Sequence, residues 1–286
     1  MAFVLPVRSR ESPLALSTPL RLAVALAPLL VPFPAPAEAP SSSAAPTAGG
    51  APRPTAAPAA FAPGEEIDLT LDYLHVRAGR VKLAVGRPEG AVWPMICQAR
   101  TEGAASLLDI REHFVSYWDA EAQASRGSDL NAIEIGDRHT DRARFDREEG
   151  KAVVRVMRKG RLRESTHDVP PGVQDLASAL LFLRLQQLEP GARFEYPVFH
   201  GTSTFMLEAQ VEGRERVETP AGRFDALRVR VHLGFKDKFE AKRDAYLWLS
   251  DDARHIPVRM SAEFSVGSIT ASLSAYRPGG QLSAAR

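Results

Sequence analysis

Apolar and polar residues alternate along much of the chain after residue 64. In the segment 67–73 the odd positions are Ile, Leu or Tyr and the even positions are Asp or Thr. The same period of two recurs in the segments 81–85, 227–233, 256–264 and 269–275. This period is typical of a strand with one face on a core and the other in water. The sequence therefore predicts several half-buried strands.

Short segments with turn-forming residues separate these strands. They are residues 77–79, 159–160, 220–222, 250–252 and 266–267. Antiparallel strands can be joined by such short turns, whereas parallel strands need long crossover connections. The predicted architecture is therefore mainly β, with an antiparallel sheet.

One segment in mid-chain has the composition of a helix. Residues Asp175–Leu188 are rich in helix formers, begin with Asp as a capping residue after Pro170-Pro171-Gly172, and end before Pro190-Gly191. The apolar residues cover more than one narrow stripe, so the helix is expected to be buried. We predict a curved antiparallel sheet, either an open barrel or a β-roll, with one long helix packed against it. A β-sandwich is the alternative architecture.

The N-terminal part of the chain has a different composition. Arginines in residues 1–21, the short apolar stretch 22–31 and the triplet Ala35-Pro36-Ala37 predict a signal peptide over 1–37. Residues 38–60 are rich in Pro, Ala and Ser and are expected to form a disordered linker. A single β-rich domain over 61–278 and a tail over 279–286 complete the predicted organisation, with no membrane span in the mature chain.

Composition and charge exclude some functions. The 286 residues have a formal net charge of +1, so the chain offers no bulk attraction to nucleic acid, and none is expected as a partner. Cys97 is the single cysteine and cannot form an intramolecular disulfide. It lies in an apolar run and is expected to be a buried core thiol.

No motif in the sequence predicts catalysis. Metal-hydrolase, serine-hydrolase, phosphate-loop and dinucleotide-binding signatures are absent, so we expect neither enzyme activity nor a cofactor. Strand alternation would place Asp137, His139 and Asp141 on one face, but nearby arginines favour an exposed charged hairpin over a metal site. The basic segment 151–163 is interpreted as a protected strand edge, with contact to anionic lipid headgroups as the alternative.

Two residues near the C-terminus are predicted to be structural. Trp248 and Pro257 flank the turn that follows Ser250. Trp248 is expected in the core. Pro257 lacks a backbone donor and is expected at an edge or a bulge.

Several motifs together resemble a known family. They include Thr219-Pro220-x-Gly222-x-Phe224 and, most specifically, the segment 247–258 with the sequence LWLSDDARHIPV. With Gly64-Glu65 and Asp175-x-x-Ser178, they resemble an exported bacterial family known only as domain of unknown function 3108. The resemblance implies secretion to the periplasm, a mainly antiparallel β domain and no assigned catalytic residues. In outline the family is similar to the curved open barrels that carry lipoproteins between bacterial membranes, which is an analogy of fold.

Three hypotheses about function follow. The first is a periplasmic binding or carrier-like module for a lipid or another hydrophobic ligand, in which Leu181 borders a cavity and Arg184 meets a headgroup at its mouth. An ion pair with a nearby acid is the alternative role for Arg184. The second hypothesis is a structural or protein-interaction module of the cell envelope with a solid core. A hydrolase is the least favoured, because no nucleophile and base can be paired from the sequence.

Overall fold

The computed structural model describes residues 60–233, 244–264 and 267–280. The predicted signal peptide, the predicted linker up to residue 59 and residues 281–286 of the predicted tail lie outside the described residues. The described residues form fourteen strands and two short helices. None of the helices in these ranges is long and apolar enough to span a bilayer.

The elements follow the chain in this order. They are β1 (Glu66–Tyr73), β2 (Val76–Val85), β3 (Val92–Thr101), the 3₁₀ helix η2 (Gly103–Leu108), β4 (Arg111–Asp119), β5 (Ala124–Glu134), β6 (Asp137–Asp146), β7 (Lys151–Arg158), β8 (Arg161–Asp168), α1 (Leu176–Arg184), β9 (Arg193–His200), β10 (Ser203–Thr219), β11 (Gly222–Leu233), β12 (Ala245–Ser250), β13 (Pro257–Phe264) and β14 (Gly267–Arg277).

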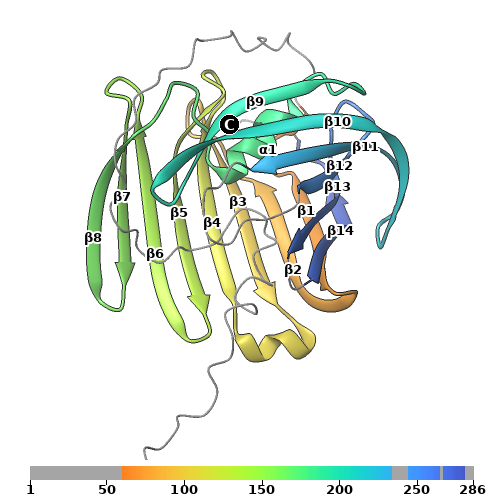
Figure 1. Ribbon diagram of the computed structural model, residues 1–286, viewed down its shortest axis with the longest axis horizontal. Helices are drawn as coiled ribbons and strands as arrows, with labels where there is room; N and C mark the ends of the chain where they lie inside the picture. The colour runs from red at the N-terminus through yellow and green to blue at the C-terminus, as the bar shows by residue number, and fades with distance from the viewer. Residues whose placement is uncertain (1–59, 234–243, 265–266, 281–286) are drawn as a thin grey trace, which may run out of the picture.

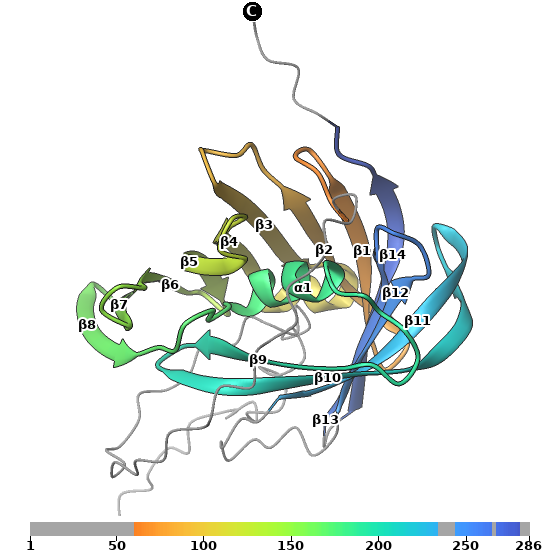
Figure 2. The same ribbon diagram turned by 90° about the horizontal axis from the view of Figure 1, so that it is seen from above.

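All fourteen strands belong to one antiparallel sheet. Its order is β8-β7-β6-β5-β4-β3-β2-β1-β14-β13-β12-β11-β10-β9, so each strand pairs with its chain neighbour and β1 pairs with β14. The sheet curves around α1, and its two edge strands, β8 and β9, are not paired with each other (Figures 1 and 2). The prediction of a mainly β fold with a curved antiparallel sheet is confirmed. The sandwich alternative is wrong, because the described strands form one sheet rather than two.

Side chains and a linker cover part of the gap between the edge strands. Gln174, in the linker between β8 and α1, forms a parallel bridge with Val198 of β9. The ring of Phe145 on β6 packs edge-on against Phe199 of β9, with centroids 5.4 Å apart. Apolar packing and a single bridge therefore take the place of a strand ladder here.

The predicted turn at residues 77–79 is wrong. These residues lie inside β2, and the chain turns at Leu74 and His75, which both have positive φ. Tyr73 pairs with Val76 and closes this two-residue turn. Gly79 is required for a different reason: a Cβ at this position would lie 2.4 Å from the carbonyl oxygen of Arg100 on β3.

The helix is shorter than predicted. It covers Leu176–Arg184 instead of Asp175–Leu188, so the expectation of one long helix is not confirmed. Asp175 is the N-cap, as predicted. At the other end, tertiary partners satisfy the helix carbonyls: the Gln186 side chain donates to the Phe182 oxygen and His255 Nδ1 donates to the Arg184 oxygen. Because these carbonyls already have donors, a further helical turn is not needed to pair them.

The main core lies between α1 and the curved sheet. Leu176, Leu181 and Leu183 of the helix are almost completely buried there. A second, smaller apolar cluster lies near the gap between the edge strands. It consists of Ala143, Phe145, Ala152, Val154, Val169, Val173 and Phe199. Cys97 is a buried core residue, and burial raises the pKa of its thiol to about 12.

The two structural residues near the C-terminus lie where predicted. Trp248 belongs to the main core and its indole N–H donates to Glu215. Pro257 is opposite Leu249 at an irregularity in the pairing of β12 and β13. The missing N–H of proline is therefore tolerated at a break in the ladder.

Candidate functional site

A polar row crosses the inner face of strands β4 to β7. In the strand register, Glu112 is opposite Ala132, Ala132 is opposite His139, and His139 is opposite Arg158. Asp141 lies two residues beyond His139 on β6, on the same side of the sheet. We call Glu112, His139, Asp141 and Arg158 the concave polar cluster. The small side chain of Ala132 separates its two most buried members.

Arg158 Nε makes an ion pair but no hydrogen bond, and three further atoms of this cluster are buried without a hydrogen-bond partner. They are Glu112 Oε2, His139 Nε2 and Asp141 Oδ1. Glu112 is 6% exposed and His139 is 2% exposed. A buried polar atom without a partner costs about 1–3 kcal/mol, so most folded proteins avoid it. Three such atoms on β4 and β6, which flank β5, mark this part of the inner face as the leading candidate for a site.

Arg158 determines which proton His139 carries. Its Nη2 lies 3.4 Å from His139 Nδ1, and its Nε lies 3.1 Å from Asp137 Oδ2. Because a guanidinium only donates, Nδ1 acts as the acceptor and the neutral imidazole carries its proton on Nε2. The unpartnered atoms are therefore a donor on His139 and acceptors on the two carboxyl groups.

The environment reduces the charge of the cluster. Burial raises the pKa of Glu112 to about 8, with a further contribution from the charge of Glu134. Burial also raises the pKa of Asp141 to about 6, and the positive charge of Arg158 opposes this change. Burial and Arg158 lower the pKa of His139. Near neutral pH, Glu112 is thus mostly protonated and its carboxyl group can donate a hydrogen bond.

Apolar side chains adjoin the cluster on the same face. Phe114 and Leu130 continue the next row of the register toward Asp141 and belong to the main core. Val156, opposite Asp141, is partly buried against the second apolar cluster. The inner face therefore has a polar end and an adjoining apolar wall.

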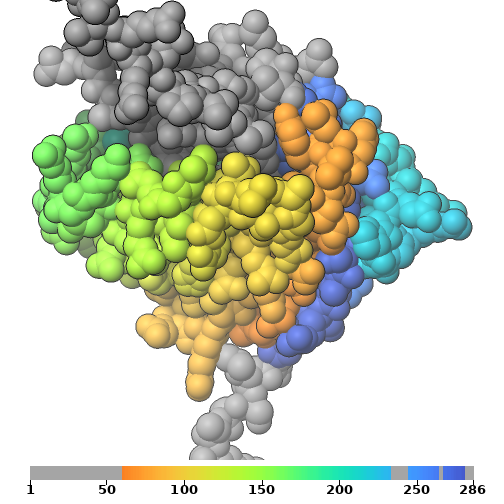
Figure 3. Space-filling model, turned by 90° about the horizontal axis from the view of Figure 1, so that it is seen from below, coloured from red at the N-terminus to blue at the C-terminus, as the bar shows by residue number. Residues whose placement is uncertain are grey.

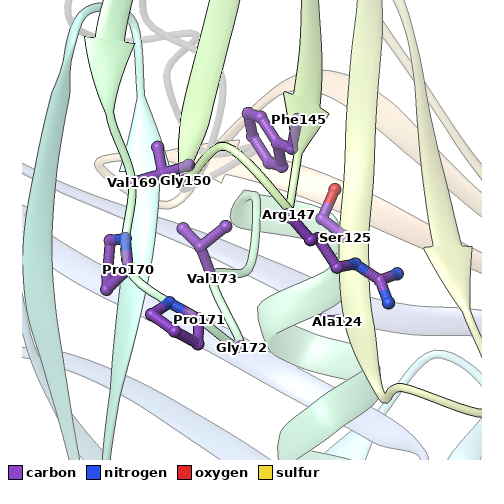
Figure 4. A pocket seen from close by; sticks show the side chains of 10 residues that line it. All are labelled: Ala124, Ser125, Phe145, Arg147, Gly150, Val169, Pro170, Pro171, Gly172 and Val173. Carbon is purple, nitrogen blue, oxygen red and sulfur yellow. The ribbon is translucent and has the colours of Figure 1, made fainter.

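A small pocket lies at the other end of these strands. It is lined by Ser125, Phe145 and Arg147 together with the linker residues 169–173 (Figure 4). Its volume is about 10 Å³, which is space for about one water molecule. This volume is far below the several hundred cubic ångströms of a typical ligand pocket.

The two residues predicted to bind a ligand are both buried. Leu181 is 0% exposed and packs in the main core. Arg184 is 1% exposed and donates from Nη1 and Nη2 to the two carboxylate oxygens of Glu65, each at 2.8 Å. Its guanidinium also donates to the backbone oxygens of Ala60 and Arg254.

The ion pair considered as the alternative role of Arg184 is therefore present, with Glu65 as the acid. Tyr276 donates a further hydrogen bond to Glu65 Oε1. The helix end where Arg184 lies is thus tied to the sheet. Ligand binding by Arg184 or Leu181 stays a prediction.

The N-cap of α1 has a similar structural network. Asp175 Oδ2 accepts from the hydroxyl groups of Ser116 and Ser125, each at 2.6 Å, and Oδ1 accepts from two backbone N–H groups of the helix. Burial raises the pKa of Asp175, whereas these hydrogen bonds lower it. The network ties the start of the helix to β4 and β5.

Alternation along β6 predicts Asp137, His139 and Asp141 on one face, whereas no pattern in the sequence points to Glu112. Alternation on β4 gave no signal, because both of its faces mix polar and aromatic residues. Only the strand register brings Glu112 and His139 into one row. Among the described residues, no group of three His, Cys, Asp or Glu side chains is arranged to hold a metal ion.

Comparison with known proteins establishes the family. The family described as "Protein of unknown function (DUF3108)" matches residues 68–274, which is most of the chain. The chain belongs to the DUF3108 family. This confirms the resemblance drawn from the sequence motifs, and the match covers nearly all of the sheet. No curated protein matches the chain.

Solved structures add information about the fold of this DUF3108 protein. A β-barrel-like protein of the domain of unknown function DUF1849 from Brucella abortus has 12% sequence identity and a TM-score of 0.51, over 76% of this chain and 98% of that chain. A Bacteroides fragilis protein, whose name describes it as exported with a YmcC-like fold, has 11% identity and a TM-score of 0.29, over 76% of this chain and 98% of that one. The first likeness shows a shared fold, and the second is too distant to carry an argument.

Proposed function

We propose that this DUF3108 protein is a non-catalytic module of the bacterial envelope that binds an amphiphilic, lipid-like ligand on the inner face of β4 to β8. The observation that carries the proposal is the concave polar cluster, with three buried polar atoms that have no partner. A ligand with hydroxyl, phosphate or amide groups would supply both the donors and the acceptors that these atoms lack. The predicted signal peptide supports the location in the envelope.

The adjoining apolar wall supports an amphiphile over a fully polar ligand. Val156 and the second apolar cluster lie beside Asp141, so a hydrocarbon chain along this wall would remain out of water while the head group met the polar row. This location differs from the cavity predicted beside α1. Around Leu181 the core is closely packed, and a ligand there would need to displace core side chains.

The proposal is tested by probe binding to protein purified from the envelope without harsh detergent. Titration with the fluorescent probe N-phenyl-1-naphthylamine should give saturable binding, and phosphatidylglycerol should compete for the site. Val156→Trp places a large ring on the inner face and should weaken probe binding by about tenfold or more, which corresponds to about 1.4 kcal/mol. Val153→Trp places the same ring on the outer face of the same strand and should leave binding unchanged.

Native mass spectrometry of the same preparation provides an independent measurement. A co-purifying lipid mass is expected for the wild type and for Val153→Trp, but not for Val156→Trp. Absence of saturable probe binding by the folded wild type would contradict the proposal. Equal binding by both tryptophan variants would place the ligand elsewhere.

The second candidate function is a structural or protein-interaction module. The closely packed core around α1 and the small volume of the pocket favour it. The two candidates differ in the result of the probe titration, because an interaction module with a solid interior should not bind the probe.

A further inference from the structure

Exposed large apolar side chains gather along one rim of the sheet. Seven such side chains are exposed in the described part of the chain, and six of them lie at or beside consecutive connections on the same edge. These connections are the β1–β2 turn, η2, the β5–β6 turn and the β7–β8 turn. The six residues are Leu74, Val76, Leu107, Ile135, Met157 and Leu162, and the seventh, Met206, lies on β10. We call these four connections the apolar rim.

The parts of the apolar rim are neighbours in space. The backbone N–H of Glu102, next to η2, donates to the Ala78 oxygen on β2, and the N–H of Ile135 donates to the Leu108 oxygen at the end of η2. The ion pair of Arg158 with Asp137 joins the β7–β8 end to the start of β6. Figure 3, seen from below, shows this edge running from the green β7–β8 strands through yellow to the orange β1–β2 region.

Positive charge accompanies the apolar side chains at the β7–β8 turn. Residues 155–163 have the sequence RVMRKGRLR, with five cations and no carboxylate. Met157 and Leu162 are opposite each other in the register, and Lys159, Arg161 and Arg163 around them are exposed. The turn therefore presents an apolar pair surrounded by cations.

The opposite ends of the same strands have a different character. The connections 86–91, 120–123 and 147–150 contain no exposed large apolar residue among those described. They carry the carboxylates Glu89, Glu121, Glu148 and Glu149 and the cations Arg87 and Arg147. Exposed large apolar side chains are thus concentrated on one rim, and the run of cations without a carboxylate is confined to its β7–β8 turn.

We propose that the apolar rim docks on the surface of an anionic phospholipid bilayer. Leu107, which is 91% exposed, and the pair Met157 and Leu162 would enter the interfacial region of the bilayer. Lys159, Arg161 and Arg163 would lie among the headgroup phosphates, where each basic residue adds to the affinity. The proposal does not depend on ligand binding at the concave polar cluster, because it rests on different residues.

Charge complementarity favours an anionic bilayer over a protein partner. At the β7–β8 turn the apolar pair Met157 and Leu162 alternates with cations, as in segments that insert shallowly into a membrane interface, whereas Ile135 of the β5–β6 turn lies between Glu134 and Asp137. A protein-binding patch would instead be expected to form a continuous apolar centre with few charges.

The test places a fluorophore at single rim positions of the full chain. Leu107→Cys and Leu162→Cys are labelled with a nitrobenzoxadiazole maleimide, and Glu148→Cys on the opposite rim is the matched control. Cys97 is buried and should not react. With vesicles of phosphatidylglycerol and phosphatidylcholine in equal parts, emission should rise and shift to shorter wavelength at both rim positions but not at Glu148→Cys. Vesicles of phosphatidylcholine alone should give a much smaller change, and salt should weaken the response.

A charge variant completes the test. Lys159→Glu combined with Arg161→Glu in the labelled Leu162→Cys protein should weaken vesicle binding by about tenfold or more. Unchanged thermal unfolding would show that these exposed substitutions leave the fold intact. An equal response to both vesicle types, or a response equal at Glu148→Cys, would overturn the proposal. A response that needs only a higher protein concentration and no vesicles would indicate self-association and would also overturn it.

Discussion

The carboxyl group of Glu112 lies on the inner face of β4, and its Oε2 atom has no partner. An exposed glutamate has a pKa of about 4.5, whereas burial raises that of Glu112 to about 8. Folding therefore favours the protonated form. The stability that comes from this protonation is complete below pH of about 4.5 and is lost as the pH rises through about 8.

Replacement by glutamine tests this effect. Glu112→Gln keeps a neutral polar group of similar shape that does not titrate. Between pH 5 and pH 8 the wild type should therefore lose about 2 to 4 kcal/mol of its free energy of unfolding relative to the variant. This range follows from about 1.4 kcal/mol for each pKa difference of one. Urea unfolding of both proteins at the two pH values measures this difference. Other titrating groups such as Asp141 occur in both proteins, so their contributions to the difference in the free energy of unfolding largely cancel. If the free energies of unfolding of the two proteins changed in parallel with pH, Glu112 would have the same pKa in the folded and unfolded protein, and the prediction would be wrong.

At the scale of elements, α1 is attached to the sheet at both ends by buried polar contacts. Asp175 connects its N-terminus to β4 and β5 through two serine hydroxyl groups. Arg184 connects its C-terminus to Glu65, just before β1. Because the charged groups are paired and hydrogen-bonded, these contacts position the helix even where they add little net stability.

Removal of the charge of Arg184 should show the free-energy cost of a buried, unpaired Glu65 carboxylate. Arg184→Met leaves the carboxylate of Glu65 buried without its cation, so the free energy of unfolding should fall by about 3–5 kcal/mol. Glu65→Leu combined with Arg184→Met should recover most of this loss. Chemical denaturation measures the free energy of unfolding of the wild type, the single variant and the double variant. The exposed pair of Arg216 and Asp225 supplies the control, since Arg216→Met should change stability by about 0–1 kcal/mol. A similarly small effect for Arg184→Met would contradict the anchoring role.

At the scale of the whole molecule, the sheet brings the two ends of the described chain together and leaves β8 and β9 as edges. The basic residues on β7 and β8 lie at one of these edges, which agrees with the interpretation of segment 151–163 as a protected strand edge. Arg155 pairs with Glu164 across the two strands. The turn itself has the exposed cations Lys159, Arg161 and Arg163 and an exposed apolar pair, and this combination is the basis of the proposed membrane contact.

Export is the prediction that concerns the whole chain. The arginines of residues 1–21, the apolar stretch 22–31 and the triplet ending at Ala37 predict cleavage after that residue. N-terminal sequencing of protein from the bacterial envelope should therefore begin at or near Glu38. Recovery of protein that retains Met1 from the cytoplasm would contradict the prediction.

The strand class, the antiparallel connections and the cap of the helix could be predicted from the amino-acid sequence alone. These features depend on neighbouring residues: a period of two, a short turn, or an Asp before a run of helix formers. The family motifs were also local, and the segment 247–258 was the most specific of them. Local rules failed at residues 77–79, because Gly79 is needed for the close approach of β3 and not for a turn.

Contacts between residues that are distant in the chain became visible only in the folded protein. Glu65 and Arg184 are 119 positions apart in the chain, and their pairing ties the end of the helix to the sheet. The row from Glu112 to Arg158 spans four strands, and the apolar rim collects residues from four separate connections. Periodicity specifies the face of a strand on which a side chain lies, but the residue opposite it depends on the register between strands, which the turns and the burial of one face fix together. Those long-range contacts created both the candidate site and the proposed membrane surface.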